Sequence, residues 1–415
     1  MRILVVGSGG REHALVWKLK QEAEVFCTPG NAGIAQTCKT FDVQAGDFLE
    51  IKALCIKHEI DLVVVGPEDP LIAGLADELR KDGIAVFGPG KEGAQLEGSK
   101  AFSKLLMVKS GVPTAEFGEF TVAGKAQEYV EEMFAKGKNV AVKASGSALG
   151  KGVVVCATKH EADEAINQIM VERVFGSAGD VVIIEECLFG HEFSLLTLVS
   201  GTEYRSLPIA QDYKRAYNGD RGPNTGGMGT YSPVAWVDSE LVEKTEKRVV
   251  EPLLAKLASK GIDYRGVLFS GLMVVGGEPY CLEYNVRFGD PETQTVMRLL
   301  GDGFADALMA CAMGEPIPEF VVKDKAAITV VMASEGYPGK YPKGKSVKIP
   351  GDLHEDVVVF HAGTSALMRD VVTSGGRVLG VSAIGSDITT ARKLAYEAVE
   401  RIEFTGKQFR TDIGA

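Results

Sequence analysis

The sequence predicts a multidomain protein of mixed α/β and α+β class, on three observations. The chain has 415 residues, more than a single hydrophobic core usually holds. Up to about residue 100, short apolar strands alternate with helical segments, and each strand ends in a turn rich in glycine or proline, which predicts an N-terminal open parallel α/β domain. From Ala326 the pattern changes to several strands and one closing helix, which predicts a small C-terminal α+β domain.

Composition limits the partners. Hydrophobic residues make up 45% and charged residues 24%, as in soluble globular proteins, and the net charge is −11 without a basic cluster, so we expect no nucleic-acid partner. The seven cysteines lack metal-like spacing and predict reduced thiols in a cytoplasmic protein. No apolar run is long enough for a membrane span, and the first residues, MRILVVGSGGREHA, predict a strand and a turn rather than a signal peptide.

A glycine turn opens the N-terminal domain. The strand Arg2–Val6 leads through Gly7–Gly10 into a helix over Arg11–Lys20, and a glycine turn before a helix can bind an anion. The third glycine of a dinucleotide fingerprint is replaced by Glu12, and the strand near Val25 to Cys27 ends without a ribose-binding acid. Nicotinamide binding is therefore disfavoured, whereas a phosphate or nucleotide-sized ligand and a purely structural turn both stay open.

Other elements follow from apolar periodicity and from turn residues. The helix over Ser99–Ser110 carries Lys100 and Lys104, which either face a site or form a solvated lysine face. The remaining expected helices are 239–260, 301–312 and 388–402, and the remaining expected strands are 61–65, 84–87, 328–332, 346–349, 357–361 and 376–383.

A Gly/Lys hairpin marks the middle of the chain. Strand Val140–Ala144 places Lys143 in an apolar run, where a lysine usually needs an anionic partner. The loop Ser145–Gly152 follows, and then the strand Val153–Cys156. A Walker loop would continue into a helix, so this pattern indicates either a hairpin that closes over a triphosphate or an exposed basic tip.

Acidic residues follow the next buried strand, Val181–Glu185. Glu185, Glu186 and Leu188 suit an adenine hinge, in which backbone groups and Leu188 contact the base, and a carboxylate nearby would bind ribose hydroxyls. Two adjacent glutamates are more often only surface residues, so this segment alone is weak evidence.

The segment Gln211–Pro233 is long, polar and rich in glycine. Loops of this length tend to be functional or disordered. Asp212, Lys214, Arg215 and the run Asn224–Gly227 offer charges and backbone N–H groups for a small polar, anionic substrate, with a disordered linker as the alternative.

A second hairpin predicts a metal site. An apolar run from Val267 is broken by Gly276-Gly277, and the second strand carries Glu283 and Asn285, two residues apart and therefore on one face. A carboxylate and an amide oxygen can hold Mg²⁺ beside phosphate oxygens, and Arg287 adds donors for anionic oxygen. The alternative is a polar strand end that closes into a helix near Thr293.

Taken together, these segments resemble the ATP-grasp superfamily and, within it, the glycinamide ribonucleotide synthetases. The resemblance extends over nearly the whole chain and rests on these segments: GSGGREHA, KASGSALGKGVVV, EECLFGHEFS, QDYKRAYNGDRGPNTGGMG, LEYNVRFGDPETQ and FRTDIG. It implies an N-terminal open α/β domain (1–103), an ATP-grasp region (104–326) with a mobile lid near 122–192, and a C-terminal α+β domain (327–415). Tyr213 and Asn218 depart from the family pattern, which usually has His and Asp there.

The resemblance also implies roles for individual residues. Catalytic roles in stabilising the charge that moves during phosphoryl transfer fall to Lys143 and Arg287. Metal binding, of Mg²⁺ or Mn²⁺, falls to Glu283 and Asn285. ATP binding falls to Lys104, Lys143, Gly150, Lys151, Gly152, Glu185, Glu186, Leu188 and Glu192. Substrate binding falls to Gly9, Gly10, Asp212, Lys214, Thr225, Gly226, Asp290 and Pro291.

The implied reaction joins glycine to 5-phosphoribosylamine, splits ATP to ADP and phosphate, passes through glycyl phosphate and belongs to de novo purine biosynthesis. We expect a monomer that acts on these small molecules. Another ATP-grasp ligase, such as a purine-pathway carboxylase or a biotin-carboxylase-like enzyme, is an alternative that the PNTGGMG and GDPETQ segments disfavour. A non-catalytic nucleotide sensor is a further alternative. Such a sensor would not need a pair of metal-binding residues, yet Glu283 and Asn285 are both present.

Overall fold

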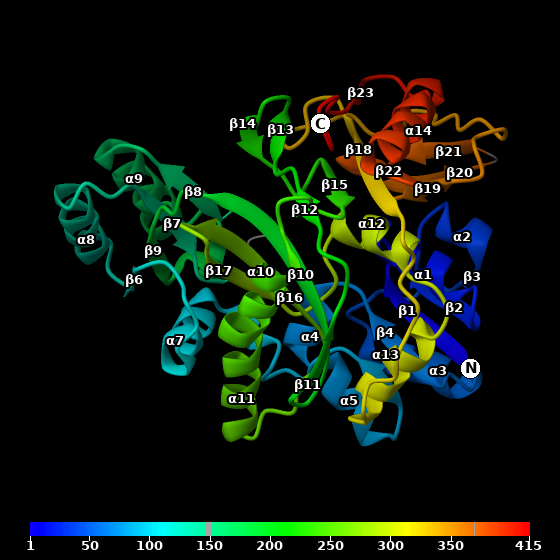
Figure 1. Cartoon of the computed structure of the whole chain (residues 1–415), viewed down its shortest axis with the longest axis horizontal. Coiled ribbons are helices and arrows are strands. Elements are labelled where there is room, and N and C mark those ends of the chain that lie inside the picture. Colours follow the sequence, from blue (N-terminus) through cyan, green and yellow to red (C-terminus); the bar gives the residue numbers. More distant parts are fainter. Residues whose placement is uncertain (147–151, 369) are drawn as a thin grey trace.

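The computed structural model describes residues 1–146, 152–368 and 370–415 (Figure 1). Its N-terminal sheet is wholly parallel, in the order β3-β2-β1-β4-β5, as the alternating pattern predicts. The strands are β1 (Arg2–Gly7), β2 (Glu24–Pro29), β3 (Lys39–Thr40), β4 (Leu62–Val65) and β5 (Ala85–Phe87). The helices of this part are α1 (Gly10–Leu19), α2 (Ile34–Thr37), α3 (Phe48–Lys57), α4 (Glu68–Ala73), α5 (Leu75–Lys81) and α6 (Gln95–Gly98).

Strand β1 is buried on both faces. Leu4 and Val6 belong to one apolar cluster, whereas Ile3 and Val5 belong to another, because successive side chains of a strand point to opposite faces. Helices cover both faces of a sheet of this kind, so its strands are nearly continuous apolar runs.

The central sheet is antiparallel, in the order β11-β10-β16-β17. Its strands are β10 (His191–Ser200), β11 (Glu203–Ser206), β16 (Arg265–Val275) and β17 (Glu278–Asn285). The predicted hairpin is confirmed: β16 and β17 pair, and Gly276 and Gly277 both have positive φ, 58° and 80°, as a two-residue hairpin turn requires.

Helical segments flank this sheet. The segment predicted as one helix over 239–260 consists of α10 (Ser239–Thr245), a π-helical turn (Glu246–Val250) and α11 (Glu251–Ser259). Pro252 lies in the first turn of α11, where its missing N–H is tolerated. The other helices are α7 (Lys100–Ser110), α12 (Glu292–Leu299) and α13 (Phe304–Met313).

A four-stranded sheet in the order β6-β9-β7-β8 lies at one end of the molecule with α8 and α9, coloured teal in Figure 1. It carries the predicted Gly/Lys hairpin, whose strands β7 and β8 pair antiparallel. The elements are β6 (Phe117–Phe120), α8 (Ala123–Ala135), β7 (Val140–Ala144), β8 (Val153–Cys156), α9 (Lys159–Ile166) and β9 (Val182–Glu186). The segment expected to be a lid, near 122–192, overlaps most of this sheet, whose strands lie between Phe117 and Glu186. Its role as a lid stays a prediction.

The C-terminal sheet runs in the order β12-β15-β18-β22-β19, and β23 also pairs with β18. A hairpin, β20–β21, and the helix α14 complete this part. The elements are β12 (Gln211–Asp212), β15 (Gly229–Ser232), β18 (Ala326–Ser334), β19 (Val357–His361), β20 (Thr364–Leu367), β21 (Asp370–Thr373), β22 (Arg377–Gly385), α14 (Ile388–Arg401) and β23 (Lys407–Gln408).

One sequence-based expectation needs correction here, and one alternative can be set aside. The strand expected over 346–349 is wrong, since Ser346 and Lys348 form only isolated bridges. The segment Gln211–Pro233 is not a disordered linker: β12 and β15 join the C-terminal sheet, while β13 (Arg215–Tyr217) and β14 (Arg221–Asn224) form a hairpin beside the C terminus (Figure 1). Strand β15 pairs with β18, far along the chain, and this pairing orders a segment whose own sequence is polar.

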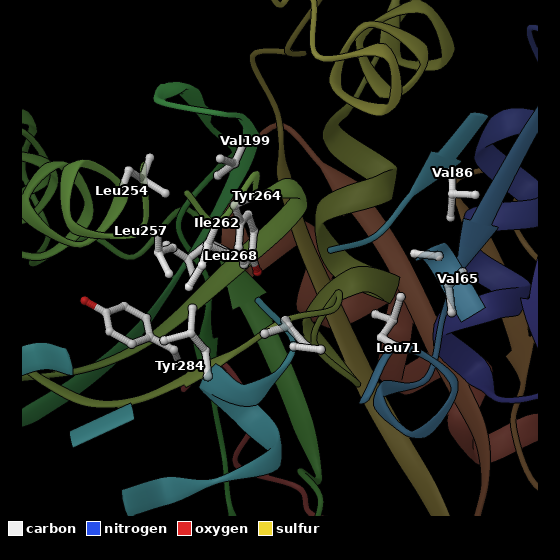
Figure 2. Close-up of a cluster of buried hydrophobic side chains, with 14 of the residues drawn as sticks. Val65, Leu71, Val86, Val199, Leu254, Leu257, Ile262, Tyr264, Leu268 and Tyr284 are labelled. Carbon is white, nitrogen blue, oxygen red and sulfur yellow. The ribbon is translucent and has the colours of Figure 1, made fainter. Parts of the chain in front are cut away.

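One apolar cluster joins the N-terminal part to the central part. Val65 and Leu71 of the N-terminal part belong to the same buried cluster as Leu254 and Tyr284 (Figure 2). The buried hydroxyl of Tyr284 donates to the backbone oxygen of Val249 at 2.7 Å, so its burial leaves no polar atom unsatisfied. Among the residues that the structure describes, no helix has the length and apolar character of a membrane span.

Candidate functional site

Two lysines share one carboxylate where the sheet β6-β9-β7-β8 meets α7. The Nζ atoms of Lys104 and Lys143 lie 2.8 and 2.9 Å from Oε2 of Glu185. In the register of β7 and β9, Ala141 pairs with Glu185 and Lys143 with Ile183, so the Lys143 and Glu185 side chains share a face of the sheet. The second carboxylate oxygen of Glu185, Oε1, is buried without a hydrogen-bond partner among the described residues.

Glu185, Lys104 and Lys143 shift one another's pKa values. Burial alone would raise the pKa of Glu185, but Lys143 and Lys104 lower it below its usual range. Burial lowers the pKa of Lys104, whereas the nearby Glu185 carboxylate raises that of Lys143 despite burial. A carboxylate held between two ammonium groups keeps a positive surplus of one, which suits the phosphates of ATP.

The expected adenine hinge begins at this carboxylate. Because the Glu185 side chain binds the two lysines, an adenine contact here would use backbone groups. The Glu186 carboxylate lies 2.9 Å from Lys138, and its N–H donates to the backbone oxygen of Glu116. Leu188 is half-buried at the end of this segment, where a base contact remains a prediction.

Glu192, expected at the ribose, accepts a hydrogen bond from Nζ of Lys214 at 2.6 Å. Both side chains are partly exposed. Burial would lower the pKa of Lys214, but Glu192, Glu283 and Asp212 raise it. The pair therefore connects a predicted ATP-binding residue, Glu192, to the predicted substrate segment.

Glu283 and Asn285 lie on one face of β17, as predicted. Asn285 pairs with Phe269 and Glu283 with Gly271, and the bulge in this strand pair lies beyond them. Their side chains are close together, with Asn285 Nδ2 3.5 Å from Glu283 Oε1, and the amide can turn its oxygen toward a cation.

The surroundings of Glu283 are strongly cationic. Burial would raise its pKa, but Lys214, Lys143, Lys100 and Arg287 lower it, so the carboxylate is ionised. The described residues contain no cluster of three or more His, Cys, Asp or Glu side chains with metal-binding geometry. Two oxygen ligands fit an ion that takes its other ligands from water and phosphate, as Mg²⁺ does.

Arg287 is held by two glutamates that the sequence analysis did not single out. Its guanidinium lies 2.9 Å from Glu97 and 3.3 Å from Glu68, both in the N-terminal part of the chain. Glu97 also accepts the backbone N–H of Val286 at 2.8 Å. Burial raises the pKa of Glu97 to about 7, although Arg287 opposes the shift. No local signal marks these partners, because they lie far from Arg287 in the sequence.

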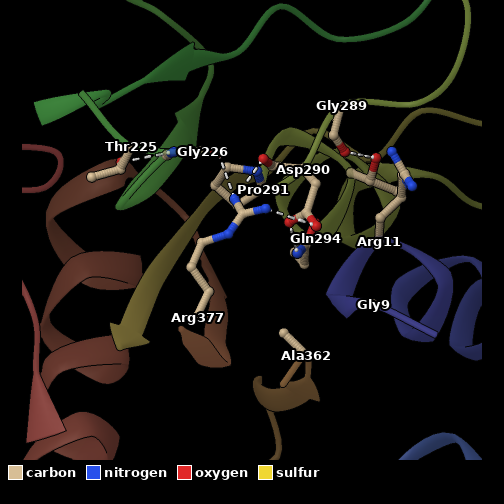
Figure 3. Close-up of polar contacts among 12 residues, drawn as sticks. Gly9, Arg11, Thr225, Gly226, Gly289, Asp290, Pro291, Gln294, Ala362 and Arg377 are labelled. Atoms are coloured by element: carbon tan, nitrogen blue, oxygen red, sulfur yellow. Dashed lines mark hydrogen bonds and ion pairs between the residues drawn. The ribbon is translucent and has the colours of Figure 1, made fainter. Parts of the chain in front are cut away.

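A separate polar cavity of about 420 Å³ lies at the carboxyl ends of β1 and β2, where ligands of open α/β sheets bind. Asp290 and Arg377 meet at its wall: Arg377 NH2 lies 3.1 Å from Asp290 Oδ2, and NH1 donates to the backbone oxygens of Asp290 and Gly226 (Figure 3). The lining residues are Ser8, Gly9, Gly30, Asn31, Asp290, Ala362, Gly363, Thr364, Ser374, Gly375 and Arg377.

The glycine turn before α1 is hydrogen-bonded to the carboxylate of Glu12, in the first turn of that helix. Gly9 N–H donates to Glu12 Oε2 at 2.6 Å, and Glu12 Oε1 accepts from Arg11 at 2.6 Å. A Cβ on Gly66 would lie 2.0 Å from Glu12 Oε1, so the glycine is required there by the close approach of Glu12. Glu12 in place of a third glycine is thus a helix-capping residue, and it is not among the residues that line the cavity.

Four more of the residues predicted to bind substrate lie near Asp290 and Arg377: Gly10, Thr225, Gly226 and Pro291. Gly10 faces Gln294, whose amide donates to Asp290 Oδ1 at 2.8 Å. Thr225 Oγ1 donates to the Lys214 backbone oxygen at 2.9 Å and accepts the Gly227 N–H at 3.0 Å. Figure 3 shows Thr225, Gly226, Asp290 and Pro291 on the same side of Arg377.

Two of the expected ATP-binding residues, Gly150 and Lys151, lie outside the described residues. Gly152, the last residue of that loop, accepts the Ala144 N–H at 2.8 Å. A second hollow, of about 550 Å³, lies beside Arg2, Glu24 and Asp61, at the amino ends of the parallel strands. Ligands of open parallel sheets bind at the opposite edge, so we assign it no function.

Comparison with models of known families shows which family this chain belongs to. Models of the phosphoribosylglycinamide synthetase N, ATP-grasp (A) and C domains match residues 1–97, 98–293 and 327–415. The chain belongs to this family. Phosphoribosylglycinamide synthetases of the ATP-grasp type are ligases that form C–N bonds and use ATP with a divalent metal.

Individual relatives agree with this assignment. The chain is 46% identical to a phosphoribosylamine–glycine ligase of Nostoc, over 100% of this chain and 99% of the relative. It is 35% identical to the crystal structure of phosphoribosylamine–glycine ligase from Thermotoga maritima, with a TM-score of 0.88 and complete coverage of both chains. The biotin carboxylase domain of Hydrogenobacter thermophilus 2-oxoglutarate carboxylase is 17% identical, covers 98% of this chain and 91% of its own at a TM-score of 0.74, and shares the fold alone.

Proposed function

We propose that this synthetase joins glycine to 5-phosphoribosylamine, giving glycinamide ribonucleotide, ADP and phosphate, in de novo purine biosynthesis. The observation that carries the proposal is the loop between β17 and α12. Arg287 on this loop lies beside Asn285, one of the two proposed metal ligands. Asp290, on the same loop, lines the polar cavity. One short segment thus connects a site for polyphosphate to a second site of suitable size for a phosphorylated sugar.

The chemistry explains why two adjoining sites are needed. A carboxylate is a poor acyl donor because its leaving group would be oxide. An oxygen of the glycine carboxylate attacks the γ-phosphorus, ADP leaves, and glycyl phosphate forms. The amine nitrogen of phosphoribosylamine then attacks the acyl carbon, phosphate leaves, and the nitrogen releases a proton. The protein supplies position and charge, and no enzyme nucleophile is required.

Lys104 and Lys143 bind the ATP phosphates in this proposal, and Lys143 and Arg287 stabilise the charge that moves during transfer. Glu283 and Asn285 would hold Mg²⁺, with Mn²⁺ as an alternative, since both ions favour oxygen ligands. When bound, the ion neutralises phosphate charge. The rest of the ATP site comprises the loop Gly150, Lys151 and Gly152, the hinge Glu185, Glu186 and Leu188, and Glu192.

Phosphoribosylamine occupies the cavity at Asp290 and Arg377. The substrate is surrounded by Gly9, Gly10, Thr225, Gly226 and Pro291. Asp212 and Lys214 lie between this cavity and the proposed metal ligands, Glu283 and Asn285. Closure of the lid would protect glycyl phosphate from water. We further propose a monomeric enzyme of the cytoplasm, where the seven free thiols would stay reduced.

The test is ADP release by the purified protein with Mg-ATP and freshly generated phosphoribosylamine, with and without glycine. We expect release to require both substrates and to match amide product one to one. Release that is indifferent to glycine would contradict the proposal. Light scattering should give the mass of one chain, and replacement of Mg²⁺ by Mn²⁺ should retain turnover.

A further inference from the structure

The hairpin of β13 and β14 has little apolar packing of its own. Residues 217–224, which include its turn and the whole of β14, are all exposed, and Ala216 is the buried residue of β13. The pairing of the two strands is irregular between Arg215 and Tyr217. A two-stranded hairpin alone is marginally stable in water, so its order depends on contacts with other parts of the chain.

The C-terminal segment, residues 410–414, supplies such contacts and lies beside the hairpin (Figure 1). The guanidinium of Arg410, 1% exposed, donates to Oδ1 of Asp220 at 2.7 Å and to the backbone oxygen of Arg215 at 3.1 Å. It also donates to both carboxylate oxygens of Asp412, at 2.8 and 2.7 Å. One buried cation thus joins a strand of the hairpin, its turn and the C-terminal segment.

Both residues that depart from the family pattern take part in this contact. The side-chain amide of Asn218 donates to Oγ1 of Thr411 at 2.6 Å and accepts the Thr411 N–H at 3.0 Å. The hydroxyl of Tyr213 accepts the Gly414 N–H at 3.1 Å. The guanidinium of Arg410 lies 4.7 Å from the centre of the Tyr213 ring, within the range of a cation–π interaction.

Helix α14 fixes the C-terminal segment from its other side. Arg392 donates to the backbone oxygens of Thr411 and Ile413, at 2.7 and 3.0 Å. The hydroxyl of Tyr396 donates to the backbone oxygen of Arg410 at 2.8 Å. Ile413 itself is fully buried in the apolar cluster of the C-terminal part. The hairpin is therefore held against a segment that is itself anchored in a core.

The two ends of the hairpin adjoin residues predicted to bind substrate. Lys214 precedes β13 and Thr225 follows β14, and the Thr225 N–H donates to the Lys214 backbone oxygen at 2.8 Å. We infer that Arg410 and the residues after it position Lys214 and Thr225 for the substrate, acting through the hairpin. The inference rests on the proposed function for the identity of that substrate, whereas the contact itself can be tested without one.

The first test uses hydrogen exchange of the protein without ligands. Asn218→Ala combined with Asp220→Asn removes contacts at the exposed side, and asparagine tolerates the positive φ of Asp220, 51°. We expect the backbone amides of residues 215–224 to exchange at least about 10-fold faster than in the wild type. The control, Arg221→Gln, changes a charge whose guanidinium donates within the hairpin, and it should leave exchange unchanged. Unchanged exchange in the double variant would overturn the inference.

The second test is steady-state turnover of the same double variant. The KM for phosphoribosylamine should rise at least about 3-fold, because only the ordered fraction binds, with the KM for ATP unchanged. Arg410→Lys keeps the charge but not the fork of donors, so it should shift exchange and KM in the same direction. Equal rises in both KM values, or a lower kcat with neither KM changed, would overturn the positioning role. Failure of the wild type to form an amide from glycine would instead overturn the proposed function.

Discussion

The Nζ atom of Lys143 lies 2.9 Å from Oε2 of Glu185, and both side chains leave the same face of the paired strands β7 and β9. Lys104, on helix α7, reaches the same oxygen at 2.8 Å. The sheet β6-β9-β7-β8 and helix α7 thus meet at a single carboxylate. Any motion of this sheet relative to α7, as we propose for a lid, would also change this ion pair.

Glu185→Gln should destabilise the protein by about 3–5 kcal/mol, because it leaves two buried ammonium groups without their carboxylate. The KM for ATP should rise as well. Urea unfolding and steady-state kinetics measure the two effects. Glu186→Gln is the control: its carboxylate is partly exposed beside Lys138, and we expect a loss below about 1 kcal/mol. Equal losses in the two variants would contradict the central role of Glu185.

Glu283→Gln should reduce kcat while the fold survives, because the change removes a charged metal ligand from the proposed site. The loss of one such electrostatic group costs about 3–4 kcal/mol of transition-state stabilisation, or roughly 10²- to 10³-fold in rate. The measurement is kcat at saturating Mg²⁺. Glu278→Gln, at the other end of the same strand, should keep wild-type turnover, and an unchanged kcat in Glu283→Gln would refute the metal assignment.

Arg377→Ala should raise the KM for phosphoribosylamine at least about 10-fold and leave the KM for ATP unchanged. Arg377 connects Asp290 to the backbone of Gly226, so its loss opens the cavity wall. Arg377→Lys keeps the charge but not the planar fork of donors, and we expect it to restore activity only in part. A raised KM for ATP in Arg377→Ala would show that the two sites are not separate in this way.

Acid should weaken the contact between the N-terminal and C-terminal parts. His13 Nδ1 accepts the backbone N–H of His361 at 2.8 Å and so must be unprotonated. Burial and His361 lower the pKa of His13 to about 3, and burial lowers that of His361 to about 4. Below about pH 6.5 the unfolded state therefore binds more protons than the folded state, and stability falls as pH falls.

The slope should approach about 1.4 kcal/mol per pH unit for each histidine. Urea unfolding at about pH 7.5 and about pH 5.5, on either side of the ordinary histidine pKa, gives the wild-type loss of free energy. His13→Gln cannot take up the proton, so its loss over the same interval should be smaller. The same loss in both proteins would assign the acid sensitivity to other groups.

Local pattern was enough to predict much of this protein. Two glycines between apolar runs predicted the β16–β17 hairpin, and the two-residue period placed Glu283 and Asn285 on one face of β17. Lys143 inside an apolar strand predicted an anionic partner, and Glu185 is that partner. These inferences hold because strand periodicity and turn chemistry depend on neighbouring residues.

Contacts between distant segments needed the tertiary structure. Arg377 meets Asp290 across 87 residues, and Glu68 meets Arg287 across 219. Tyr213 and Asn218, which depart from the family pattern, both contact the C-terminal segment, through Gly414 and Thr411. No local period marks such pairs, since each depends on how separate sheets dock.

The class of fold and the family resemblance were thus readable from the amino-acid order alone, and so were the residues proposed to bind phosphate and metal. Two features emerged only from the packed chain: Glu12 caps its own glycine turn, and β12 and β15 join the C-terminal sheet. The difference comes from the range of the interactions, because backbone geometry acts over a few residues, whereas buried charges find their partners only when the whole chain has folded.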